Sequence, residues 1–265
     1  MKDSLMHSLA ISVACLCILI SGSSFVAAQH IIPSGQLIID GKPDGDLEGK
    51  TLPFEVSQGR IGGGIGPYVV YLCYDAENIY VACNAVDDSV SCKDGATEDF
   101  MDSDYLRFYI CVDDDFKGRT ALNGTTDWAI IFTPTDTDDN WVPMVKECPY
   151  NGPGHGVIEG DDVTANRASG PVADGWYLEA AVPFSLLETT MDELSKITFG
   201  VYFITGDTDA GGTRTGEMSL GGVAGGGNYW NSPDYWQESK LGAYNLAVDI
   251  ADKTATMWGQ IKVIH

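Results

Sequence analysis

Acidic residues at alternate positions of polar segments are the side chains of this chain best suited to bind an ion. Each lies in a loop-like run or at the end of an apolar segment. The six that we expect to be ligands are Asp87, Asp113, Asp136, Asp138, Asp207 and Asp209. Such spacing suits a hard cation like calcium, which takes about six to eight oxygen ligands. We therefore expect a structural calcium ion, with solvated acidic loops as the alternative.

Residues that could carry catalysis form no recognisable constellation. Beyond the N-terminal segment the histidines are His30, His155 and His265, of which two lie near the ends of the chain and one lies in a Gly- and Pro-containing loop. A nucleophile with an adjacent base cannot be placed by spacing. With 38 acidic residues, a pair of carboxylates at glycosidase separation carries no information. We expect that the protein is not an enzyme.

The N-terminus has the pattern of a secretory signal. Lys2 precedes an apolar stretch from Leu9 to Ile20, and Val26-Ala27-Ala28 offers a cleavage site before Gln29. The alternative is a membrane anchor, but the apolar core is too short to span a bilayer. We expect a signal peptide at 1–28 and a mature protein outside the cytoplasm, secreted, periplasmic or on the cell surface.

The cysteines indicate buried thiols and at most a partial disulfide framework. Five remain after the signal, with no C-x-x-C pair, so a zinc ribbon or redox motif is not supported. Cys73, Cys83 and Cys111 stand in strand-like runs, where a thiol behaves as a small apolar group. Cys92 and Cys148 stand in loop-like sequence and are the better disulfide candidates in an oxidising compartment.

The charge excludes several classes of partner. The formal net charge is −23, from 38 acidic and 15 basic residues. Nucleic acids and acidic lipid surfaces need basic patches, which the chain lacks. A charge this negative favours divalent cations, or keeps a secreted protein soluble.

The elements that must position these residues are strands. Apolar, β-branched and aromatic runs end in acidic or Gly-rich turns, helical periodicity is almost absent, and no linker separates two cores. Expected strands are 36–40, 68–74, 79–86, 105–112, 128–132, 141–145, 176–182, 197–205, 245–250 and 256–264. Long loops are expected at 44–66, 147–171 and 206–234. A bend into a short helical turn is expected at 183–187, continued by 188–196. We predict one antiparallel β-sandwich, of jelly-roll or immunoglobulin-like type, over 29–265.

The ordered set of strand phrases resembles the family 9 carbohydrate-binding modules and the wider group of DOMON-like sandwiches. The phrases are IDG at 39–41, YDAENIYV at 74–81, DD at 87–88, the run 104–113, GWYLEAAVPF at 175–184, the run 200–207 and NYWNSP at 228–233. The resemblance covers nearly all of 36–250. It implies binding of a saccharide chain end between two aromatic faces, and structural calcium near the acidic loops.

The resemblance also implies site residues. Trp230 corresponds to the late aromatic of the family, and Phe100 is the nearest match to the early one. Polar and further aromatic contacts are expected from Arg107, Asn228 and Trp236. The family tends to have a Glu where this chain has Arg107. Packing of a Gly-rich loop is the alternative for Trp230 and Trp236, whereas Trp128 and Trp176 are expected in the core.

Two other functions remain open. Related sandwich domains hold a b-type haem, and the conceivable axial ligands here are Met101, Met144, Met218 and His155. A calcium-ordered structural protein of the cell surface is the third reading. Expected partners of the first reading are an oligosaccharide or polysaccharide, and a glycoside hydrolase or a cell-surface assembly. The sequon Asn123-Gly124-Thr125 marks an expected surface turn.

Overall fold

The structure is a computed structural model, and it describes most of the chain beyond the N-terminal segment. The described residues are 29–43, 47, 51–61, 66–91, 103–134, 144–149, 166–209, 213–220 and 229–245. The predicted signal peptide at 1–28 and the expected strand at 256–264 lie outside them. None of the helices in these ranges is long and apolar enough to cross a membrane.

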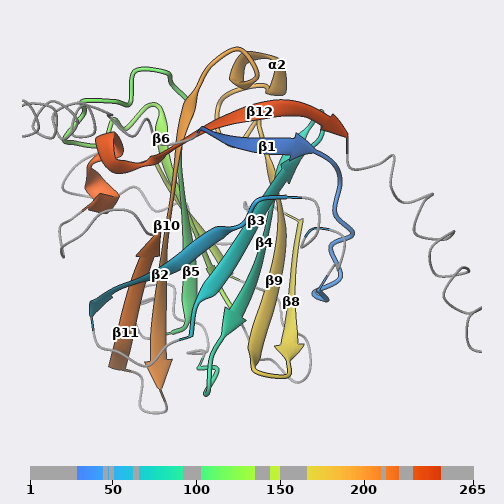
Figure 1. The fold of residues 1–265 in the computed structure, drawn as a ribbon, viewed down its shortest axis with the longest axis vertical. Helices are drawn as coiled ribbons and strands as arrows, with labels where there is room; N and C mark the ends of the chain where they lie inside the picture. The colour runs from blue at the N-terminus through green and yellow to red at the C-terminus, as the bar shows by residue number, and fades with distance from the viewer. Residues whose placement is uncertain are drawn as a thin grey trace, which may run out of the picture.

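Twelve strands in the described ranges form one hydrogen-bonded sheet (Figure 1). They are β1 His30–Ser34, β2 Phe54–Ile61, β3 Tyr68–Tyr74, β4 Asn78–Val86, β5 Tyr105–Cys111, β6 Asp127–Thr133, β7 Met144–Pro149, β8 Asn166–Val172, β9 Gly175–Pro183, β10 Phe199–Asp209, β11 Thr213–Leu220 and β12 Gln237–Asn245. The strand order is β7-β6-β5-β10-β11-β2-β3-β4-β9-β8. Short helical elements are α2 Met191–Leu194, η3 Tyr229–Asn231 and η4 Pro233–Tyr235.

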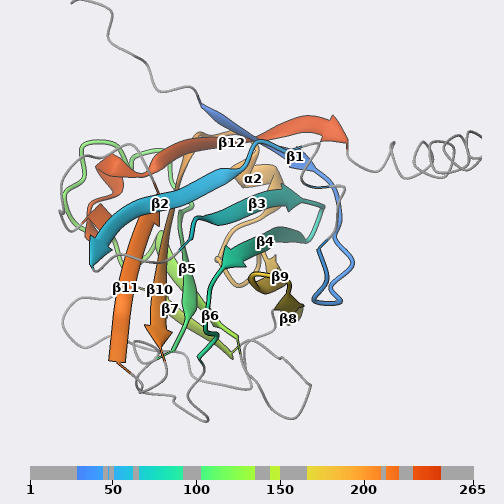
Figure 2. The same cartoon turned by 60° about the horizontal axis from the view of Figure 1, so that its bottom comes forward.

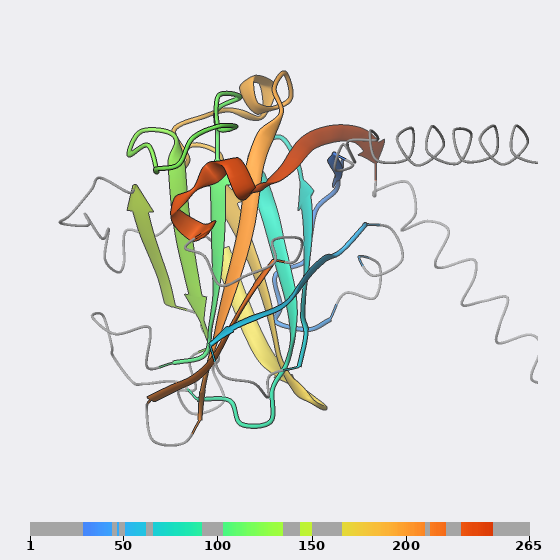
Figure 3. The ribbon, with the colours of Figure 1, turned by 60° about the vertical axis from the view of Figure 1, so that its left-hand side comes forward.

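The sheet folds over on itself into two layers. Figure 3 shows β6, β5 and β10 in one layer and β3, β4 and β9 in the other, with β2 crossing between them. Figure 2 shows β1 and β12 running together along one end, where they pair in parallel. The protein is thus an all-β sandwich, as the strand pattern predicted.

The core between the layers is aromatic and aliphatic. Leu106, Phe108 and Ile110 of β5 are fully buried in it. The ring of Phe108 stacks on Phe203 of β10 at 5.4 Å, and Phe203 meets Phe54 of β2 edge to face at 5.1 Å. Such pairs stabilise beyond their buried area by about 0.5 to 1.5 kcal/mol. The core therefore joins strands that are distant in sequence.

The tryptophans and cysteines of the strands behave largely as predicted. Trp128 and Trp176 are core residues, with 4% and 0% of their surfaces exposed. Cys73, Cys83 and Cys111 are buried free thiols. Cys148 lies in strand β7 and not in a loop, and Cys92 lies outside the described residues, so their pairing stays a prediction.

Several strand boundaries were predicted wrongly. Residues 36–40 are not a strand, and the first strand is β1. The expected loops at 44–66 and 206–234 contain β2 and β11, which pair with each other. These two strands carry glycines and polar residues between the buried ones, so their apolar content is low. The strand expected at 141–145 overlaps β7 at 144–149, whereas 237–245 form β12, a strand that the sequence did not predict. The strand expected at 245–250 lies outside the described residues except for Asn245, so it stays a prediction.

Candidate functional site

The second face of β5 and β10 carries aromatic and charged side chains. Because strand side chains alternate, Tyr105, Arg107 and Tyr109 point away from the core that holds their neighbours. Arg107 pairs across the ladder with Ile204, and Tyr109 pairs with Tyr202. We call this surface, made of these five residues, the outer face. Its rings form a second buried cluster, separate from the core between the layers.

Arg107 occupies the middle of the outer face. Its guanidinium carbon lies 5.7 Å from the ring centroids of both Tyr105 and Tyr109. Its Nη1 donates a hydrogen bond of 2.7 Å to the hydroxyl of Tyr109. A guanidinium held between two rings is an oriented fork of donors for hydroxyl or carboxylate oxygens. The strand geometry and the rings therefore preorganise Arg107.

A second guanidinium joins the outer face through Tyr105. The hydroxyl of Tyr105 donates to Glu217 of β11 at 3.0 Å, and Arg214 also donates to Glu217. Burial raises the pKa of Tyr105, so its hydroxyl stays protonated and acts as a donor. Glu217 is 5% exposed, which makes this ion pair a largely desolvated one. The outer face thus brings two arginines and one glutamate together in a strongly acidic protein.

Tyr105 needs a glycine opposite it on β10. A Cβ on Gly206 would lie 2.0 Å from Cε1 of Tyr105, so the ring crosses the strand where no side chain stands. We expect Gly206→Ala to displace the ring and lower the free energy of unfolding by about 1 to 3 kcal/mol, as overpacking does. Urea denaturation measures this. The matched control is Gly59→Ala in β2, whose Cβ would meet nothing within 4 Å. Equal losses in both variants would contradict the prediction.

The two tryptophans near the C-terminus have different surroundings. Trp230 of η3 is partly buried and packs against the cluster of the outer face. Trp236 is 1% exposed, and its ring lies 5.6 Å from that of Tyr109. A ring that stacks on a ligand needs an open face, so the expectation that Trp236 contacts a ligand is wrong. Phe100 and Asn228 lie outside the described residues.

Three buried aspartates meet at one end of the interior. They are Asp87 after β4, Asp104 before β5 and Asp207 in β10, and one carboxylate oxygen of each lies within 4.8 Å of the others. Asp104 is completely buried, and the other two are each 7% exposed. We call this group the aspartate triad. It joins the two layers, because β4 belongs to one layer and β5 and β10 belong to the other.

The carboxylates of the triad accept hydrogen bonds, but none of them pairs with a basic side chain among the described residues. Its carboxylates accept bonds from backbone amides and hydroxyls. The donors are the amides of Ser89, Ser91 and Thr208 and the hydroxyls of Tyr68 and Thr215. The ion pairs between described residues include none of the three carboxylates. Three buried like charges oppose each other unless a proton or a metal ion neutralises them.

Burial raises the pKa of two of the three aspartates in the triad. Desolvation, with the negative charges of Asp87 and Asp207 added, raises the pKa of Asp104 to about 8. Desolvation also raises the pKa of Asp207. The donor set is three carboxylates, which is the chemistry that a hard divalent cation such as calcium prefers. The residues present therefore fit calcium.

The triad includes only part of the predicted ligand set. Asp87 and Asp207 were predicted, but Asp104 was missed, although it continues the inward alternation of β5. Asp209 is exposed and outside the triad. Asp113 follows β5 at the opposite end, where it lines a hollow of about 400 Å³. Asp136 and Asp138 lie outside the described residues.

The raised pKa of Asp104 predicts how stability depends on pH in EDTA. The folded protein holds this proton more tightly than the unfolded chain, whose Asp pKa is about 3.9. The contribution of Asp104 to the free energy of unfolding therefore falls as pH rises toward 8. His30 has the opposite slope, because burial lowers its pKa to about 4, but its effect ends near pH 6.5. Between pH 6.5 and 8 we expect a loss of about 1 to 2 kcal/mol in urea denaturation. A flat profile, or the same slope in Asp104→Asn, would contradict this.

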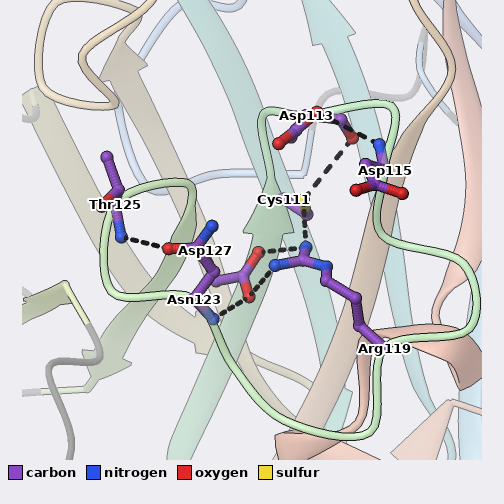
Figure 4. Close-up of polar contacts among 7 residues, drawn as sticks. All are labelled: Cys111, Asp113, Asp115, Arg119, Asn123, Thr125 and Asp127. Atoms are coloured by element: carbon purple, nitrogen blue, oxygen red, sulfur yellow. Dashed lines mark hydrogen bonds and ion pairs between the residues drawn. The ribbon is translucent and has the colours of Figure 1, made fainter.

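A polar clamp fixes the loop between β5 and β6 (Figure 4). The guanidinium of Arg119 donates to both carboxylate oxygens of Asp127, at 2.8 and 3.1 Å. It also contacts Sγ of Cys111 at 2.9 Å, and the amide of Asn123 donates to Asp127 at 2.7 Å. Asp127 is 1% exposed, so the clamp is largely shielded from water. We call these four residues the clamp.

The residues considered as haem ligands find little support in the geometry. Met218 is 6% exposed and belongs to the core between the layers. Met101 and His155 lie outside the described residues, and Met144 is described only as part of strand β7. Of these four residues only Met218 has a described side chain, so haem ligation by the other three stays a prediction.

Comparison with known proteins places the fold. No protein-family model matches the chain, and no curated protein matches it. A family 9 carbohydrate-binding module from Caldicellulosiruptor kristjanssonii in complex with cellotriose has a similar structure, with a TM-score of 0.59 and 15% identity over 82% of this chain and 94% of the other. A family 9 module from the same organism in complex with glucose gives 0.59 and 14%, over 82% and 96%. The chain therefore has the fold of family 9 modules, as its strand phrases predicted.

Proposed function

We propose that this protein is a non-catalytic saccharide-binding module whose site is formed by Arg107 of the outer face and by Trp230, both of which are partly exposed. The observation that carries the proposal is the constellation on that face. Aromatic rings surround the fixed guanidinium of Arg107, and Trp230 packs against the same cluster. Apolar C–H faces of a pyranose pack on rings, while its hydroxyls need directional partners. Trp230 offers the ring and Arg107 offers the directional donors, whereas the buried tyrosine rings of the outer face hold Arg107 in place.

The structural neighbours support this proposal. The two similar modules were solved with cellotriose and with glucose. Their fold matches over most of both chains, so a saccharide site is a reasonable property to test in this one. Binding of saccharide chain ends, with a contribution from Phe100 and Asn228, remains part of the proposal.

A glycan panel tests the proposal. Isothermal titration calorimetry with glucose, cellotriose and a series of neutral and acidic oligosaccharides is expected to give heat with at least one of them. Competition between a free chain end and its reduced or capped form distinguishes end binding from binding along the chain. Absence of heat across the whole panel, with folded protein and calcium present, would remove the proposal.

The proposal includes a calcium ion in the aspartate triad. Asp87, Asp104 and Asp207 would hold it, and the ion would neutralise their buried charge while joining the two layers. Its role would be structural. A calcium-ordered scaffold of the cell surface is the second candidate function, and the triad is the observation that favours it.

Location and partners complete the proposal. Secretion rests on the signal-like sequence at 1–28. Association with a polysaccharide-degrading enzyme or a surface assembly would follow from saccharide binding outside the cell. Expression with the native N-terminus, followed by mass measurement of the exported protein, tests cleavage after Ala28.

A further inference from the structure

Asp234 makes most of the hydrogen bonds that attach the segment carrying Trp230 to the loop between β5 and β6. We call 229–236, which contains η3 and η4, the tryptophan segment. The carboxylate of Asp234 accepts a bond of 2.7 Å from the amide of Gly118, and its own amide donates to the carbonyl of Arg119 at 3.1 Å. Nζ of Lys117 donates to the carbonyls of Asp234 and Trp236, each at 3.2 Å. Asp234 is thus the centre of this attachment.

The loop that donates a hydrogen bond to Asp234 is itself fixed by the clamp and by a buried ring. Arg119 is held by Asp127 and Cys111 of the clamp (Figure 4). Phe116 belongs to the cluster of the outer face and is 1% exposed. Like Trp236, it packs over Gly200 of β10. Gly118 has φ of +77°, a conformation that favours glycine. The clamp and the buried ring therefore present a fixed amide to Asp234.

The tryptophan segment is buried at its end, where Trp236 packs on Tyr109, and is less buried at Trp230. Its helical elements are single 3₁₀ turns, whose hydrogen bonds are poorer than those of an α-helix. Trp230 is only partly buried. A ring that is ordered before the ligand arrives spares the ligand the entropic cost of ordering it. Anchorage of this segment therefore affects affinity more than overall stability.

We propose that Asp234 is a positioning residue of the saccharide site, which holds Trp230 in place through Gly118 and the clamp. This inference rests on the proposed function. Asp234 does not touch the ligand in this proposal. It acts by fixing the backbone on which Trp230 stands.

Three variants test it, with calcium present and with the saccharide identified by the panel. Asp234→Ala removes the acceptor for Gly118, Asp234→Asn keeps a carbonyl oxygen there, and Asp115→Ala removes a charge from an exposed residue of the same loop. The measurements are the dissociation constant by calorimetry, the melting temperature, and hydrogen exchange of the amides of 229–236.

For Asp234→Ala we expect at least fivefold weaker binding and at least tenfold faster exchange in 229–236, with a melting temperature within about 3 °C of the parent. Asp234→Asn should restore both to within about twofold, and Asp115→Ala should change neither. Unchanged affinity in Asp234→Ala, or equal losses in Asp234→Asn, overturns the inference. If the parent binds no saccharide, the proposed function fails, whereas unchanged exchange in Asp234→Ala refutes the anchorage separately.

Discussion

Calcium is expected to raise the melting temperature of the metal-free protein by about 5 to 10 °C when its free concentration is about 100 times the dissociation constant. A ligand that binds only the folded state contributes about 2.7 kcal/mol at that ratio. For a protein of this size, each kcal/mol shifts the melting temperature by about 2 to 4 °C. Differential scanning calorimetry in EDTA and in calcium measures the shift.

The variant Asp207→Asn separates this effect from general stabilisation by salt. In EDTA we expect it to be at least as stable as the parent, because it removes a buried carboxylate that lies beside Asp87 and Asp104 and keeps an acceptor for Thr215. In calcium we expect it to lose most of the gain. Asp115→Asn, which removes the same charge from an exposed position, should keep the gain in full. A parent that calcium does not stabilise, or a variant that gains as much, would refute the calcium site.

Replacement of Trp230 by alanine is expected to weaken saccharide binding by about 10- to 100-fold. Loss of contact with an aromatic ring removes about 1.5 to 3 kcal/mol of apolar burial, and about 1.4 kcal/mol is a factor of ten. Trp230→Phe should give an intermediate affinity, since it keeps a smaller ring. Calorimetry with the best ligand of the panel measures both.

The control for Trp230→Ala is a variant that removes an apolar side chain far from the proposed site. Ile38 is 74% exposed and lies outside the clusters of buried and partly buried side chains that the structure describes, so Ile38→Ala should bind as the parent does. Near-ultraviolet circular dichroism checks that Trp230→Ala remains folded. Parent-like affinity in a folded Trp230→Ala protein would show that the saccharide binds elsewhere.

The strands that carry continuous apolar runs could be predicted from sequence, and the others could not. The run at 105–112 is buried on both faces, so every residue in it is apolar or aromatic except Arg107. By contrast, β2 alternates buried Phe54 and Val56 with exposed Glu55 and Ser57, and its second half is the polar run Gln58-Gly59-Arg60. It pairs with the next strand, β3, but also with β11, which lies far away in sequence. Local pattern cannot supply that information.

The candidate site could be predicted only in part, because it too depends on pairing between strands that are distant in sequence. Spacing within a loop pointed to Asp207 and Asp209 together, but the strand turns Asp207 inward and leaves Asp209 exposed. Asp104 joins Asp207 only because β5 and β10 pair in register, which no short segment encodes. The resemblance implied that Trp236 contacts a ligand, but its ring packs against Tyr109 on the outer face and is buried there, which local sequence does not encode.

The aspartate triad has a consequence for the rates of folding and unfolding. Its members lie in or next to three strands, β4, β5 and β10, which come together only when the two layers have docked. An ion bound there acts on an arrangement that forms late, so it should slow unfolding while leaving early collapse unaffected. Persistence of the folded protein in harsh surroundings would then depend on the lifetime of the bound ion.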